Sequence, residues 1–245
     1  MSENLKSIVF ALSTAVVCSL LLTVAAQGLN PLQQENAAVD QQKNILKSVG
    51  LIAADRAYTA EDIKRLYAEN IRCIRVDENG NVVTSDAADP PLLPVYLYRK
   101  DSAVAAYIIP IDSRGLWGRI HGYLALAADG ATIAGFTVYK HSETPGLGGE
   151  IEKRWFQDNF KGKKIVDRQG HFTAISIVKQ AKLDTLPAAE RINAVDGISG
   201  ATLTGRFLSA GLKHTLSEYE PVSIKFRTNR LLHLPADAEG CETTP

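Results

Sequence analysis

A ten-residue stretch rich in glycine and hydroxyl groups, DGISGATLTG at residues 196–205, carries the clearest chemical signal in the sequence. Its small residues Gly197, Gly200 and Ala201 would let the backbone approach a bulky anion closely. The helix expected after them offers unpaired N–H groups and the positive end of its dipole. The stretch therefore predicts a phosphate site. It lacks the lysine of a GxxxxGK[ST] loop, which argues against a nucleoside triphosphatase.

The hydroxyl groups of this stretch, on Ser199, Thr202 and Thr204, allow a simpler interpretation. Ser199 or Thr202 could accept a hydrogen bond from the first free N–H groups of the helix and so act as its N-cap. A cap accounts for one hydroxyl and leaves the surrounding small residues unexplained, so both interpretations stay open. We expect Thr204 to lie on the ordinary surface of the first helical turn.

A second glycine-rich loop, HSETPGLGGE at residues 141–150, follows a predicted strand. It is not a dinucleotide fingerprint, because Ile151 occupies the third glycine position of GxGxxG. One interpretation is a loop that ends the strand, with Glu150 starting a helix. In the other, Thr144-Pro145 fixes an extended bend, and the glycines expose backbone amides that can bond the carbonyls and ring nitrogens of a planar cofactor.

The aromatic candidate is Trp117, which lies between Gly115 and Gly118 in SRGLWGRIHGY at residues 113–123. An indole in such a place either fills the hydrophobic core or covers one face of an aromatic ring. Taken alone, this stretch favours the core.

Composition excludes several classes of function. The 27 basic and 27 acidic residues cancel, so the chain has no overall basic footprint and we expect no nucleic-acid partner. The five histidines form no HxxxH or HExxH pair, and the three cysteines fit no zinc or iron–sulfur spacing, so we predict no metal site. Cys73 and Cys241 could pair in an oxidising compartment. No nucleophile elbow is present, and we assign no catalytic residue.

Alternating apolar residues predict three strand pairs joined by tight turns, which indicates a largely antiparallel sheet and an α+β fold class. The predicted pairs occupy residues 73–85, 94–111 and 122–141. A further strand is predicted at 171–179. Helices are predicted at 59–69, where Thr59 can act as the cap, at 150–160, and at 203–220. The last of these carries an apolar stripe that comprises Leu203, Phe207, Leu208, Leu212, Leu216 and Tyr219.

The N-terminal region carries 19 uncharged residues, 8–26, which as a helix would span roughly 28 Å, close to the thickness of a bilayer core. A cleaved signal peptide is the alternative, but its apolar region is usually shorter. Lys6 before the span favours a cytoplasmic N-terminus. Gly28 to Pro31 should break the helix. The predicted segments are a cytoplasmic stub at 1–7, a transmembrane helix at 8–27, a helical connector at 28–70, an α+β domain at 71–228 and a C-terminal tail at 229–245.

Taken together, these stretches resemble a known family. Asp196, Ser199, Gly200, Ala201 and Thr202 fit D-x-x-[ST]-G-A-[ST], which is similar to the flavinylation motif of FMN-binding domains. GLW at 115–117, GYLAL at 122–126, ETPGLGGEI at 143–151 and the N-terminal span resemble, within this family, the C subunits of sodium-translocating NADH:quinone reductases. The resemblance extends to about residue 226. The G subunit of the Rnf electron-transport complex shares several of these motifs and is the alternative.

The resemblance implies a site for covalent FMN. A flavin transferase would move FMN from FAD onto Thr202 through a phosphoester, and Asp196, Ser199, Gly200 and Ala201 would serve recognition and pack the phosphate. The isoalloxazine would be lined by Glu143, Thr144, Gly146, Leu147 and Gly148, and shielded by Leu116 and Trp117. Lys179 would be a cationic neighbour of the ring or the phosphate.

The resemblance also implies an electron-relay subunit that does not itself bind NADH. Its partners would be the other subunits of the NADH:ubiquinone reductase, in the bacterial inner membrane, with the soluble domain on the periplasmic side. A hypothesis from a different class is a non-redox, membrane-tethered domain that binds a phosphorylated ligand or a protein partner. That hypothesis predicts a colourless purified protein.

Overall fold

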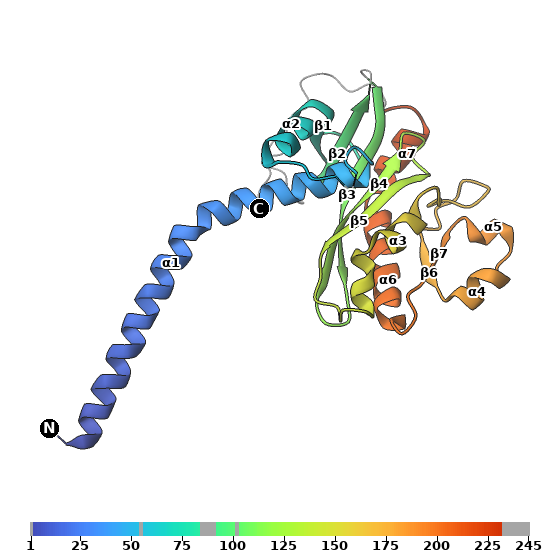
Figure 1. The fold of residues 1–245 in the computed structure, drawn as a ribbon. Coiled ribbons are helices and arrows are strands. Elements are labelled where there is room, and N and C mark those ends of the chain that lie inside the picture. Colours follow the sequence, from blue (N-terminus) through green and yellow to red (C-terminus); the bar gives the residue numbers. More distant parts are fainter. Residues whose placement is uncertain (1, 54–55, 84–91, 101–102, 232–245) are drawn as a thin grey trace. The chain divides into compact units, whose positions relative to one another are not determined.

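The central element of the computed structural model, which describes residues 2–53, 56–83, 92–100 and 103–231, is a five-stranded antiparallel sheet (Figure 1). Each strand pairs with the next along the chain, in the order β1-β2-β3-β4-β5. The strands are β1 (Ile71–Val76), β2 (Leu93–Lys100), β3 (Ala103–Arg114), β4 (Arg119–Ala127) and β5 (Ile133–Lys140). The predicted α+β class is confirmed, as are the strand pairs at 94–111 and 122–141. Of the first predicted pair, residues 73–83 are described, and within them one bridge joins Val76 to Val82, while β1 pairs with β2 instead.

One face of the sheet packs against α6 (Thr202–Glu218) and α7 (Glu220–Arg227). The approach of α6 to β3 is close, because a Cβ on Gly211 would lie 2.0 Å from Ser113 Oγ. Phe136 and Val138 of β5 belong to this core. Apolar burial on this face is the main stabilising contribution to the domain.

The opposite face of the sheet packs against α2 (Ala60–Asn70) and the end of α1 (Glu3–Ser48). Side chains alternate along a strand, so Gly135 and Thr137 point away from the α6 face. A Cβ on Gly135 would lie 2.2 Å from the Ser48 carbonyl oxygen, and Thr137 donates to the Asn44 carbonyl. The start of α2 has the predicted Thr59 cap, which forms a capping box with Asp62.

The N-terminal helix α1 runs unbroken from Glu3 to Ser48, so the predicted break at Gly28 to Pro31 is wrong. Pro31 removes one backbone N–H, and the helix-forming residues after it continue the helix. An 18-residue stretch of α1 has a mean hydropathy of 2.5 and is fully exposed, long and apolar enough to cross a membrane. The chain divides into two compact units after Gln41, and the predicted segment boundaries stay predictions.

Between β5 and α6 the chain is less regular than predicted. The helix expected at 150–160 is divided into two 3₁₀ turns, η1 (Gly148–Glu152) and η2 (Asp158–Phe160), and one helical turn, α3 (Arg154–Gln157). The strand expected at 171–179 is only β6 (Ser176–Val178), which pairs in parallel with β7 (Ala194–Asp196) in a separate sheet. Two short helices, α4 (Gln180–Thr185) and α5 (Ala188–Arg191), connect these strands.

Cys18 is a free cysteine. The predicted Cys73–Cys241 pair involves a residue outside the described part of the chain, as does most of the predicted tail at 229–245.

Candidate functional site

The loop between β7 and α6 is built by backbone geometry. Gly197 N–H donates to the Val178 carbonyl at 2.7 Å, which joins the loop to the end of β6. Gly200 has a φ of +78°, a conformation that other residues rarely adopt. The chain then enters α6 at Thr202, with Ala201 as the N-cap residue.

The N-cap interpretation of the hydroxyls is wrong. No side chain caps α6, because Ala201 occupies the cap position and Thr202 is already the first helical residue. Ser199 and Thr202 are both exposed. Within the described part of the chain, the first N–H groups of α6 therefore lack a side-chain cap, and they lie beside the exposed Thr202 hydroxyl at the positive end of the helix dipole.

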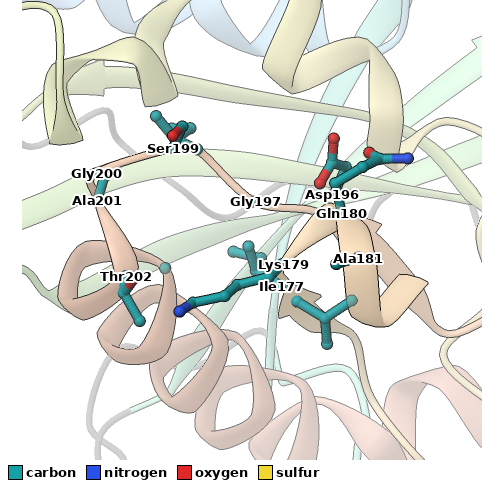
Figure 2. Close-up of a pocket in the computed structure, with 13 residues that line it drawn as sticks. Ile177, Lys179, Gln180, Ala181, Asp196, Gly197, Ser199, Gly200, Ala201 and Thr202 are labelled. Carbon is teal, nitrogen blue, oxygen red and sulfur yellow. The ribbon is translucent and has the colours of Figure 1, made fainter. Parts of the chain in front are cut away.

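A hollow of about 440 Å³ lies beside this loop, where the carboxyl ends of β6 and β7 meet (Figure 2). In Figure 2 the Lys179 side chain extends along the hollow in the direction of Thr202, while Asp196 and Gln180 lie at the other end of the view. Asp196 Oδ1 is buried and has no hydrogen-bond partner among the described residues. This hollow, which we call the polar hollow, thus offers a cation and an unsatisfied acceptor. Its lining is Ile177–Ala181, Asp196–Thr202 and Gly205.

A second hollow of about 160 Å³ shares Gly200, Ala201 and Thr202 with the first. Large apolar side chains at its rim are exposed, which is unusual for residues of this size gathered in one place. They are Leu116 at 42%, Trp117 at 69%, Leu147 at 44% and Leu203 at 45% exposure. We call this second site the apolar hollow.

The core interpretation of Trp117 is wrong. The indole belongs to the turn between β3 and β4, which is closed by a 2.7 Å hydrogen bond from Gly115 N–H to the Gly118 carbonyl. A turn at the end of a sheet has no second layer to cover it, so its side chains stay exposed.

Glu143 lines the apolar hollow and is almost fully buried, with the residue at 5% exposure. Its Oε1 accepts from the backbone N–H groups of Leu116 at 2.8 Å and Trp117 at 3.0 Å. Its Oε2 accepts from the hydroxyl of Thr204 at 2.5 Å. The prediction that Thr204 is ordinary surface is therefore wrong, since it is 2% exposed. Its spacing of four from Leu208, which is on the buried stripe of α6, is the signal that could have indicated this.

Of the residues predicted to bind a cofactor, all except Gly146 line one or both hollows. Gly146 instead has a φ of +74° and provides the turn between Thr144 and Leu147. Lys179 and Trp117 line different hollows, which the sequence could not indicate. Gln180 and Leu203 also line the site and were not predicted.

Comparison with known proteins places this site in a family. The FMN-binding domain family matches residues 115–217, which include both glycine-rich loops. The C subunit of the Na(+)-translocating NADH-quinone reductase of Vibrio anguillarum is 31% identical over 244 residues, covering 87% of this chain and 89% of the relative. The C subunit of the same reductase in Pseudomonas aeruginosa is 33% identical over 232 residues, covering 82% and 87%.

A solved structure gives the same result. The crystal structure of the C subunit of Na(+)-translocating NADH-quinone reductase from Parabacteroides distasonis has a TM-score of 0.68 and 33% identity, and the match covers 82% of this chain and 97% of that chain. The resemblance predicted from the motifs is confirmed. Because the relatives match most of its length at above 30% identity, the chain belongs to the family of the C subunits of Na(+)-translocating NADH-quinone reductases.

Proposed function

We propose that this chain is a membrane-anchored electron-transfer subunit of a sodium-translocating NADH:quinone reductase, and that it carries FMN as a phosphoester on Thr202. The observation that carries the proposal is the position of Thr202, which is exposed, begins α6 and lies where the polar and apolar hollows meet. The other subunits of the complex would be its electron-transfer partners, and a flavin transferase would mature it.

The residues around Thr202 fit the phosphate of FMN. A phosphoester there retains one negative charge, which the N-terminus of α6 and the ammonium group of Lys179 favour. Gly200 and Ala201 leave room for the phosphate oxygens beside the backbone. Asp196 Oδ1, which is buried without a partner among the described residues, could accept from a hydroxyl or N–H group of the cofactor.

The apolar hollow fits the aromatic part of FMN. Leu116, Trp117 and Leu147 expose apolar surface beside Thr202 and would shield a ring system from water. The backbone at Thr144 and Gly148 supplies polar groups along the same wall. When bound, FMN supplies one-electron and two-electron redox chemistry, while the protein holds it and tunes its environment.

Attachment would form a bond between the Thr202 hydroxyl oxygen and the phosphorus of the FMN half of FAD. The pyrophosphate bond of FAD breaks, AMP leaves, and the hydroxyl proton is released to solvent. Thr202 has no hydrogen bond to another described side chain that would hold its hydroxyl away from the transferase. Ser199 and Gly200, which are also exposed, would form part of the surface that the transferase reads.

The apolar part of α1 would anchor the subunit in the bacterial inner membrane, with the domain on the periplasmic side. The alternative is that residues 8–26 belong to a signal peptide that is cleaved. The mass of the N-terminal peptide of the purified protein distinguishes the two. A mature chain that retains residues 8–26 and sediments with membranes is expected. A mature chain that begins near residue 27 would contradict the anchor.

Loss of the Thr202 hydroxyl tests the attachment. The full chain is expressed with a flavin transferase, denatured and separated on a gel that is viewed under ultraviolet light. Wild type should fluoresce, and Thr202→Val should be completely dark because the variant keeps the shape of threonine and lacks the nucleophile. Mass spectrometry of the tryptic peptide should show FMN less one water on Thr202.

The matched control is Thr228→Val, which makes the same substitution at an exposed threonine at the end of α7 that lines neither hollow. It should still fluoresce. Equal fluorescence in Thr202→Val and wild type would place the flavin elsewhere. A colourless native protein with no flavin absorbance would instead support the non-redox, ligand-binding or partner-binding alternative.

A further inference from the structure

The carboxylate of Glu143 joins three segments that are distant in sequence. It lies in the loop after β5, and it accepts hydrogen bonds from the turn between β3 and β4 and from the first turn of α6. Both of its oxygens are engaged, one by the N–H groups of Leu116 and Trp117 and the other by the Thr204 hydroxyl. The carboxylate therefore serves the protein itself, and is not held free for a ligand.

Two glycines make room for this carboxylate. A Cβ on Gly115 would lie 2.5 Å from Glu143 Oε1, and a Cβ on Gly148 would lie 2.5 Å from Thr204 Oγ1 and 2.7 Å from Glu143 Oε2. None of these distances is one that real Cβ atoms adopt. Glycine at both positions is thus a condition for the buried contact, independent of the hydrogen bonds themselves.

A second layer of contacts holds the Glu143 backbone. Its N–H donates to His141 Nδ1 at 3.1 Å, so a neutral His141 carries its proton on Nε2, which faces Glu152 Oε2 at 3.3 Å. The side chain of His141 is 13% exposed. Main chain and side chain of Glu143 are therefore both fixed.

We propose that Glu143 is a positioning residue, whose carboxylate ties the turn carrying Leu116 and Trp117 to the start of α6 and so holds the apolar rim beside Thr202. The geometry of the tie is present in the chain itself, and its consequence for FMN rests on the proposed function. The amides of Leu116 and Trp117 are joined to α6 through the Glu143 carboxylate, so removing this carboxylate should release the turn. The sheet and α6 should remain folded.

The experiment uses the full chain in detergent, expressed without a flavin transferase, so that its outcome does not depend on where flavin attaches. Hydrogen–deuterium exchange of the Leu116 and Trp117 amides reports the tie directly. The Gly115 amide is the internal reference, because its acceptor is the Gly118 carbonyl. In a Trp155→Phe background, acrylamide quenching of Trp117 fluorescence reports the mobility of the turn.

Glu143→Ala should speed exchange at Leu116 and Trp117 by at least about tenfold relative to Gly115, since it removes the acceptor of both amides. Glu143→Gln retains an acceptor oxygen and loses the charge, so it should speed exchange by less. Thr204→Val removes the hydroxyl at constant shape and should raise the quenching of Trp117, whereas Thr204→Ser should restore the wild-type value.

The proposal is overturned if Glu143→Gln and Thr204→Val both leave amide exchange and Trp117 quenching at wild-type values. It is also overturned if Thr204→Ser fails to restore the wild-type value, because serine has the hydroxyl on which the hydrogen bond to Glu143 depends. If Glu143→Ala does not fold, Glu143→Gln, Thr204→Val and Thr204→Ser still test whether Glu143 holds the turn. Loss of the fluorescent gel band at Thr202→Val is measured separately and does not enter this test.

Discussion

Two carboxylates line the hollows that meet at Thr202, and they differ in how their oxygens are satisfied. Glu143, in the apolar hollow, is buried and accepts from three donors. Asp196, in the polar hollow, keeps one buried oxygen without a partner among the described residues. A satisfied buried carboxylate stabilises the fold, whereas an unsatisfied one lowers stability and is retained where a ligand completes it. On the proposed function, the difference distinguishes Glu143, which builds the site, from Asp196, whose free oxygen FMN would engage.

Replacing each carboxylate by alanine should have unequal consequences for stability. Glu143→Ala should lower the free energy of unfolding by about 3 kcal/mol, because it leaves the buried Thr204 hydroxyl and two amides without an acceptor. Asp196→Ala should change it by less than about 0.5 kcal/mol or raise it, since the unsatisfied oxygen is removed. Urea denaturation followed by circular dichroism measures both.

Equal losses in the two variants would remove the distinction between the hollows. The flavin content after expression with the transferase adds a second reading. Asp196→Ala should reduce it even where stability is unchanged.

The glycines around Glu143 should show how tightly the apolar hollow is built. Gly148→Ala should destabilise the domain by about 2 kcal/mol, because its Cβ has no space between Thr204 and Glu143. Gly146→Ala, in the same loop, meets no atom within 4 Å and should lose only about 1 kcal/mol from its positive φ. The difference between the two urea midpoints measures the cost of crowding a Cβ at position 148 against Thr204 and Glu143. A larger loss of stability in Gly146→Ala than in Gly148→Ala would contradict the tight packing around Glu143.

The cation of the polar hollow should affect the cofactor more than the fold. Lys179 is exposed, so Lys179→Met should change the free energy of unfolding by less than about 0.5 kcal/mol. In the flavinylated protein the same change should make the midpoint potential of the flavin more negative, because a positive charge that favours the reduced form is lost. A spectroelectrochemical titration with no shift would place Lys179 away from the flavin.

The smallest effect is expected at Glu152, which supports the Glu143 loop from outside. Its hydrogen bond with Lys153, and secondarily the one with His141, lowers the pKa of Glu152 below its usual value of 4.5. A lowered folded-state pKa gives stabilisation that is present above the unfolded pKa and lost as the pH falls through the folded one. Glu152→Gln should therefore cost a few tenths of a kcal/mol near pH 7, after solvent screening, and close to nothing at a pH well below 4.5, where the carboxyl is protonated in both the folded and the unfolded state. Thermal midpoints at both pH values check this.

Most of the sheet could be predicted because its sequence signals are local. Alternating apolar residues and turn sequences specify β2 to β5, and the Thr59 capping box specifies where α2 begins. These features depend on residues a few positions apart, so the sequence contains them completely. The motif DGISGAT also indicated the correct family, since its spacing is local.

The predictions were wrong where contacts between segments distant in the sequence determine the structure. Thr204 was expected on the surface because its partner Glu143 is 61 residues away. Trp117 was expected in the core because its hydrophobicity is visible in the sequence and the lack of a covering layer is not. The helix expected at 150–160 is broken into short turns, and the strand expected at 171–179 is shortened, because packing overrides local preference in this region.

The exposed start of α6 also bears on the order of events in biogenesis. The two hollows are assembled from turns that come together only in the folded domain, whereas Ser199, Gly200 and Thr202 remain on the outside once it has formed. On the proposed function, the transferase would therefore act on a finished domain and would not need to capture the chain while it is still unfolded. The chain would then fold as a stable, colourless precursor, and cofactor supply would set the number of working subunits without limiting how many fold.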